Sequence, residues 1–175
     1  MRPVEGGTVS PRGGTPPRDA KGAAMLGTLS EEQIDRLLRA EVVGRIGCHA
    51  AGRTYVVPVT YVYDGGAIYG HTGAGLKVRM MRQDPEVCFE VDRLENMGNW
   101  RSVIAWGRFE ELRGTAAAHA MGLLLDRLLP LVASETAAPP HDVAPSDVHR
   151  AEVTGHEPVV YRIVIREKTG RFEKR

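Results

Sequence analysis

Residues 67–82 (AIYGHTGAGLKVRMMR) combine the residue types that bind an anion. A short apolar strand leads past His71 and Thr72 into three small residues, and a basic segment with a helical pattern follows from Lys77 onward. The free N–H groups and the dipole of a helix's first turn favour negative charge, and Lys77 adds a full positive charge. The spacing is not that of a Walker loop or a dinucleotide fingerprint. The pattern therefore fits an anion site and a plain strand-turn-helix corner equally well.

A second stretch, residues 54–63 (TYVVPVTYVY), is the strongest predicted strand because it is dense in β-branched and aromatic residues. Pro58 interrupts it and has no N–H to donate to a neighbouring strand. The proline therefore predicts a sheet edge, a bulge or a break in the ladder at that point. Any of these would leave backbone groups open to the edge of a ligand.

The elements that must position these residues follow from capping, periodicity and turn signals. Ser30 and Gln33 have capping-box spacing, which predicts a helix from Ser30 to about Glu41. Alternating patterns predict strands, and amphipathic patterns predict two further helices. The expected strands are 42–50, 54–63, 67–72, 86–92, 100–112 and 158–167, and the further helices are about 75–83 and 116–129. We expect a loop at 93–99, a bulge or bend at Gly107, a bend or helix end at Pro130, and fraying after residue 167.

About six strands in mostly sequential antiparallel order, with three helices, predict a mainly β (α+β) domain built on a small barrel. The domain is expected over residues 25–170, and residues 171–175 form a charged end. Residues 1–24 are rich in Gly, Pro, Arg and Thr and carry few large apolar side chains, so we predict a disordered tail there.

Composition excludes several classes of function. The 175 residues are 42% hydrophobic and 26% charged with a net charge of +1, which argues against wholesale nucleic-acid binding. No apolar run approaches the roughly 20 residues of a membrane helix, and no signal-peptide core is present. Cys48 and Cys88 lie in apolar runs and are expected as reduced thiols, so the default location is the cytoplasm.

Other catalytic chemistries have no motif here. The sequence has no G-x-S-x-G elbow and no defensible Cys-His pair. The remaining histidines lack metal-ligand spacing, so no metal site is expected. They are His49, His119, His141, His149 and His156.

The order of these motifs resembles the flavin-binding split-barrel superfamily, and within it the pyridoxamine 5'-phosphate oxidase-like branch that includes the nitroimidazole-resistance proteins. The resemblance rests on YVVPVTYVY, the DGG turn, IYGHTGAGLK, PEVCFEVD and WRSVIAWGRFEEL, covers about residues 26–112, and continues more loosely to residue 166. It implies a six-stranded antiparallel split β-barrel with flanking helices, assembled as a homodimer. One flavin mononucleotide (FMN) would occupy each of two clefts between the subunits.

The resemblance also implies roles for particular residues. The strand Val57, Pro58, Val59, Thr60 would lie along the isoalloxazine edge, with His71 and Thr72 beside the flavin. Lys77 would meet the phosphate, and Ser102 would supply a polar contact near the ring or the ribityl chain. Trp100 and Trp106 fit barrel or interface packing better than stacking on the flavin.

Two departures from the family pattern limit the assignment. Pyridoxamine phosphate oxidases carry an Arg-Lys pair where this chain has Leu76-Lys77, so a second phosphate contact must come from elsewhere, with Arg79 the best candidate. They also carry a C-terminal Trp and an Arg-x-His constellation, which the ending RIVIREKTGRFEKR lacks. We therefore do not predict vitamin-B6 oxidase activity.

The leading hypothesis is an FMN-dependent oxidoreductase that passes electrons from a nicotinamide to a small planar acceptor, such as a nitroaromatic compound. His71 is the candidate proton donor to the product, because the unperturbed pKa of a histidine side chain, about 6.5, lies near neutral pH. The alternative is a non-catalytic protein of the same fold that binds flavin, deazaflavin or haem. An empty structural dimer is a third possibility.

Overall fold

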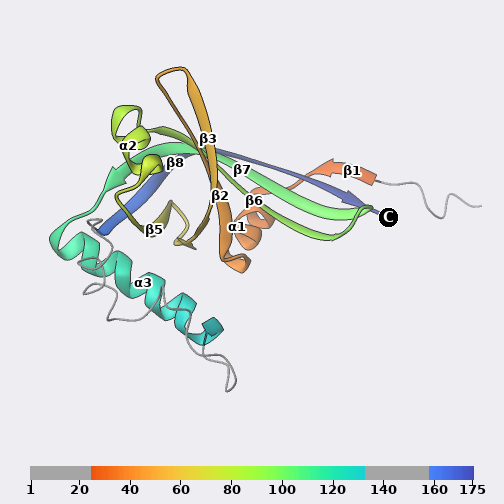
Figure 1. Cartoon of the computed structure of the whole chain (residues 1–175). Coiled ribbons are helices and arrows are strands. Elements are labelled where there is room, and N and C mark those ends of the chain that lie inside the picture. The colour runs from red at the N-terminus through yellow and green to blue at the C-terminus, as the bar shows by residue number, and fades with distance from the viewer. Residues whose placement is uncertain (1–24, 133–157) are drawn as a thin grey trace, which may run out of the picture.

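One antiparallel sheet carries most of the described chain. The computed structural model describes residues 25–132 and 158–175. In these residues eight strands and three helices are present, and the strands follow the order β3-β2-β6-β7-β8-β5-β4, with β1 pairing to β8 (Figure 1). The strands are β1 (Met25–Thr28), β2 (Val43–Ala50), β3 (Arg53–Thr60), β4 (Val62–Tyr63), β5 (Ala67–Gly73), β6 (Glu86–Asn96), β7 (Asn99–Glu111) and β8 (Pro158–Lys174). The expected mainly β, split-barrel architecture is confirmed.

The sheet curls but does not close through a continuous ladder. Strands β3 and β4 lie at the two ends of the strand order, yet they are separated in sequence by Tyr61 alone. The chain therefore crosses from one sheet edge to the other at Tyr61, whose N–H donates to the carbonyl of Val42 at 3.0 Å. The Tyr61 hydroxyl donates to the carbonyl of Leu38 at 2.9 Å, which fixes this crossing to the first helix.

Helix α1 (Glu31–Ala40) begins at the predicted capping box. The Ser30 N–H donates to the Gln33 side-chain oxygen at 2.8 Å, and the Gln33 N–H donates to the Ser30 hydroxyl at 3.4 Å. Its apolar stripe is buried in the barrel core. At the other end of α1, Arg127 of α3 (Gly114–Val132) donates hydrogen bonds to the backbone carbonyls of Arg39 and Ala40. Helix α3 thus supplies donors to carbonyl groups that have no partner within α1.

Several strands are longer than predicted. Residues 93–99, expected as a loop, belong to a long β6–β7 hairpin, and β8 continues to Lys174 rather than fraying after residue 167. One face of each of these segments is open to solvent and carries charged residues. These residues made the segments resemble a loop and a frayed end rather than strands. Strand β1 was not predicted, and α3 continues through Pro130 to Val132 instead of ending at the proline. The eight strands thus exceed the predicted six.

The bulge at Gly107 is confirmed. The pairing of β7 with β8 shifts register between Trp106 and Gly107. A Cβ atom on Gly107 would lie 2.5 Å from the carbonyl oxygen of Val164, a distance that no side chain tolerates. Glycine is therefore required at this position, where β8 leaves no room for a side chain on β7.

Candidate functional site

The first turn of helix α2 (Leu76–Gln83) carries a cation with no carboxylate beside it. The N-cap is Gly75, so no side chain caps the helix, and no acidic residue lies in the first turn. Lys77 is half-buried, and none of the described carboxylates forms an ion pair with it. Burial lowers the pKa of Lys77, and its attraction to Cys48 opposes that effect only in part. An anion placed here would meet both the helix dipole and the ammonium group.

Helix α2 is held in place by its opposite face. Val78 and Met81 are fully buried, and the helix packs against β2. Arg82 donates to both carboxylate oxygens of Glu111, at 2.5 and 2.9 Å, which ties the end of α2 to the end of β7. The helix that presents Lys77 is therefore anchored from two directions.

The end of β5 leads directly to this helix. His71 and Thr72 pair with Val160 and Val159 of β8, and both are partly exposed. A Cβ atom at the preceding Gly70 would overlap the hydroxyl of Tyr161. Glycine at this position therefore leaves room for the Tyr161 side chain. The N–H of Gly75 donates to the carbonyl of Gly73 at 2.7 Å, a tight turn that carries the chain from the strand into the helix.

Strand β3 is an edge strand in the described sheet. It pairs with β2 in unbroken register from Val43↔Thr60 to Ala50↔Arg53, with Pro58 opposite Arg45. The edge is therefore the correct one of the three predicted explanations for Pro58, and the predicted break in the ladder is absent. Along β3, Val57 and Val59 are partly buried, whereas Pro58 and Thr60 are exposed. Strand β3 also contacts β5, the strand that carries His71.

Two predicted site residues lie apart from Lys77 within one chain. Arg79 is exposed and follows Lys77 by two positions, so the two side chains leave the helix in different directions. Ser102 lies on β7, separated from β3 by β2 and β6, and its hydroxyl donates to Glu90 at 3.3 Å. Strand β3 contacts β5, and β5 leads into α2, whereas Ser102 lies on none of these three elements.

The outer face of the sheet carries a cavity that the sequence analysis missed. Its volume is about 530 Å³, and Val56 and Trp106 on its walls have 60% and 42% of their surface exposed. Arg45 crosses the same face and pairs with Glu90 at 2.8 Å and Asp92 at 2.6 Å. The signal was present in the alternation of β2, β6 and β7, but the pattern does not say which face remains open. The lining residues are Arg45, Gly47, Cys48, His49, Thr54, Val56, Glu86, Val87, Cys88, Glu90 and Trp106.

Metal and membrane features can be stated for the described residues. Within 25–132 and 158–175 no group of three or more His, Cys, Asp or Glu side chains could hold a metal ion. None of the helices in these ranges has the length and apolar character that crossing a bilayer requires.

Comparison with known proteins gives a family match over most of the chain. Residues 30–172 match the family model described as pyridoxamine 5'-phosphate oxidase. An uncharacterised protein of Rhizobium meliloti is 30% identical over 91 residues, which is 52% of this chain and 60% of that protein. The chain therefore matches less than two thirds of that relative's length.

Solved structures show the same fold. A FAD-binding protein of Mesorhizobium loti is 27% identical and superposes with a TM-score of 0.69 over 87% of this chain and 100% of that chain. A protein of Bacteroides thetaiotaomicron named for 5-nitroimidazole antibiotic resistance is 15% identical, with a TM-score of 0.63 over 86% of this chain and 89% of that chain, and its likeness shows the fold alone. Together with the family match over residues 30–172, these findings establish that the chain belongs to the pyridoxamine 5'-phosphate oxidase family.

Proposed function

We propose that this protein is a flavin-dependent oxidoreductase that binds FMN. The observation that carries the proposal is the half-buried ammonium of Lys77 at the uncapped start of α2, without a carboxylate partner among the described residues. A flavin phosphate would supply the missing anion and use the free N–H groups of the same turn. The edge strand β3 would meet the polar rim of the isoalloxazine ring through Val57, Pro58, Val59 and Thr60.

The bound flavin would supply two-electron transfer between a nicotinamide and a small planar acceptor. The residues of this chain would bind and orient it. Thr72 would hydrogen-bond near the ring, and His71 would hold a proton for the reduced product, since an imidazole titrates close to neutral pH. The family name alone does not support vitamin-B6 oxidase activity here, because the chain lacks the C-terminal Arg-x-His constellation.

A homodimer would complete the site. Ser102 lies on β7, which β2 and β6 separate from the edge strand β3, so the proposed contact with the flavin would come from the Ser102 of a second copy. The exposed Val56 and Trp106 on the outer sheet face support association, because burying them would remove apolar surface from water.

The test is the visible spectrum of freshly purified protein. We expect an absorption band near 450 nm, FMN in the supernatant after denaturation, and oxidation of a reduced nicotinamide in the presence of a nitroaromatic acceptor. Release of FAD in place of FMN would support the proposed site and change the identity of the flavin. FAD is the cofactor named for the Mesorhizobium loti relative. Bound flavin without turnover would favour the carrier alternative. A colourless protein that takes up no FMN in titration would overturn the proposal.

A further inference from the structure

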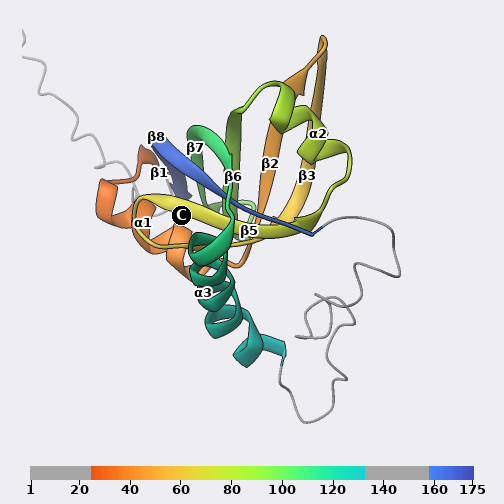
Figure 2. The same ribbon diagram turned by 90° about the vertical axis from the view of Figure 1, so that its left-hand side faces the viewer.

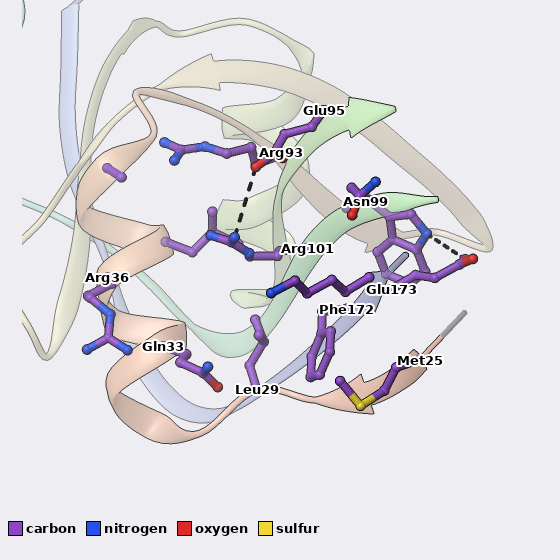
Figure 3. Close-up of a pocket in the computed structure, with 14 residues that line it drawn as sticks. Met25, Leu29, Gln33, Arg36, Arg93, Glu95, Asn99, Arg101, Phe172 and Glu173 are labelled. Carbon is purple, nitrogen blue, oxygen red and sulfur yellow. Dashed lines mark hydrogen bonds and ion pairs between the residues drawn. The ribbon is translucent and has the colours of Figure 1, made fainter. Parts of the chain in front are cut away.

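A second cavity lies between α1 and the β6–β7 hairpin (Figure 3). Its volume is about 660 Å³, within the roughly 300–1,000 Å³ that is typical of small-molecule sites. None of the residues proposed to bind the flavin lines it, and Figure 2 shows α1 and α2 at opposite ends of the curled sheet. The lining residues are Met25, Leu29, Gln33, Arg36, Leu37, Ala40, Arg93, Glu95, Asn99, Trp100, Arg101, Phe172, Glu173 and Lys174.

Three lining residues of this cavity, Arg93, Arg101 and Phe172, belong to one row of paired residues that runs across four strands. Arg93 of β6 pairs directly with Arg101 of β7, Arg101 pairs with Phe172 of β8, and Phe172 pairs with Gly27 of β1. Paired residues of neighbouring strands share a face of the sheet, so two guanidinium groups and an aromatic ring lie side by side. A Cβ atom on Gly27 would lie 2.7 Å from the ring of Phe172, so glycine leaves the space that this ring occupies.

The two arginines are like charges at directly opposite positions, an arrangement that costs stability unless anions compensate it. Arg93 has a close partner, because it bonds to Glu41 at 2.6 Å. Among the described residues, Arg101 has one long ion pair of 4.0 Å, with Glu95, and both side chains of that pair are more than half exposed. The Arg101 guanidinium therefore keeps most of its capacity to bind an anion.

The rest of the lining adds positive charge and apolar surface. Arg36 and Lys174 bring the cationic side chains to four, against the two acidic residues Glu95 and Glu173. Glu173 accepts a hydrogen bond from the Trp100 indole at 3.2 Å, which uses part of its capacity. Leu29 and Leu37 are buried members of the core at the base of α1, and Phe172 packs against that core. The cavity thus combines cationic and apolar side chains in one lining.

From this arrangement we propose a second small-molecule site, which takes a planar aromatic ligand that carries a carboxylate. The carboxylate binds the fork of Arg101, with Arg93 beside it, and the ring packs against Phe172 and Leu29. A planar carboxylate matches the guanidinium fork, and a flat ring matches the face of an aromatic side chain. This site does not depend on flavin binding at α2.

The experiment is calorimetric titration of the full-length protein with 2-naphthoate as the probe. The neutral 2-naphthamide and inorganic phosphate serve as comparison ligands. The variants are Arg101→Gln, Arg101→Lys and the control Arg171→Gln, which removes an exposed arginine from the opposite face of β8. Arg101 is exposed, so its replacement is expected to leave the fold intact, and the melting temperature checks this.

We expect 2-naphthoate to bind the wild-type protein and the Arg171→Gln variant equally, and to bind Arg101→Gln at least about tenfold more weakly. Arg101→Lys should retain an intermediate affinity, because it keeps the charge and loses the fork. The affinity should be the same with and without saturating FMN. Three outcomes would each overturn the proposal: no binding to wild type, equal binding of naphthamide and naphthoate, or equal affinities in Arg101→Gln and wild type. Phosphate binding as tight as that of naphthoate would also overturn the assigned ligand class.

Discussion

Lys77 and Cys48 interact where α2 packs against β2, and each modifies the ionisation of the other. Burial lowers the pKa of Lys77 and raises the pKa of Cys48, while the attraction between an ammonium and a thiolate opposes both shifts. The thiol stays neutral at physiological pH, so it gives Lys77 no counter-charge. A cation held in this way is stabilised by a ligand that brings negative charge.

Replacing Lys77 with Ala should weaken FMN binding at least about tenfold, because a charge-assisted hydrogen bond to the phosphate contributes about 1.5–3 kcal/mol. The affinity is measured by quenching of FMN fluorescence on titration into apoprotein. Arg79→Ala is the matched control, since it removes an exposed cation from the same helix. A larger loss in Arg79→Ala than in Lys77→Ala would show that the phosphate lies on the other side of α2.

The affinity for FMN should also depend on pH through Lys77. Because burial lowers the pKa of Lys77 below its ordinary 10.5, the ammonium loses its proton as pH rises through that lowered value. Wild-type affinity should therefore fall on the alkaline side earlier than the affinity of Lys77→Arg, whose guanidinium stays charged. If the FMN affinities of the two proteins changed with pH in the same way between neutral pH and pH 10, the result would contradict a contact between Lys77 and the phosphate.

A separate ion pair holds α1 to the sheet. Asp35 accepts hydrogen bonds from Lys168 at 2.5 Å and from the Tyr63 hydroxyl at 2.9 Å. Burial raises the pKa of Asp35, but these two hydrogen bonds outweigh it, so the net pKa lies below the usual 3.8. The carboxylate therefore stabilises the fold above the unfolded-state pKa, and this contribution is lost as pH falls through the folded-state value.

Accordingly, Asp35→Asn should lower the free energy of unfolding by about 1–2 kcal/mol at pH 7, measured by urea denaturation. The difference from wild type should shrink as pH falls through the lowered pKa of Asp35, because the carboxylate of wild type then becomes protonated. Glu32→Gln on the exposed side of α1 is the control, because its 3.6 Å pair with Arg36 is solvent-exposed and should contribute less than about 0.5 kcal/mol. A pH-independent difference for Asp35→Asn would show that shape, not charge, stabilises this contact.

The sequence predicted best the elements whose signals are local. The capping box of α1 and the glycine bulge in β7 each depend on a few neighbouring residues, and both are confirmed. The strand–turn–helix order around Lys77 is confirmed for the same reason. The edge position of β3 was one of three explanations offered for Pro58, and only the pairing of whole strands could select it.

Features that depend on long-range pairing were not predicted. Strand β1 pairs with the last residues of β8, so neither segment shows its partner in its own sequence. The register of the β6–β7 hairpin makes Arg93 and Arg101 neighbours, although eight positions separate them in the chain. The cavity beside α1 follows from that register, which explains why no motif indicated it.

The proposed dimer predicts that Trp106→Asp produces a monomer. Trp106 is a large, exposed aromatic residue on the outer sheet face, and a carboxylate in a buried interface would be costly to desolvate. Light scattering after size-exclusion chromatography gives the mass, which should be twice the 19.1 kDa of one chain for wild type. Met97→Asp at the tip of the β6–β7 hairpin is the control. The Met97 side chain is 84% exposed, so its replacement should leave the mass unchanged.

If Trp106→Asp remains dimeric, the subunits associate through another face. If it becomes monomeric and loses FMN as well, the cofactor site requires both copies, as proposed from the position of Ser102 on β7, two strands away from the edge of the sheet at β3.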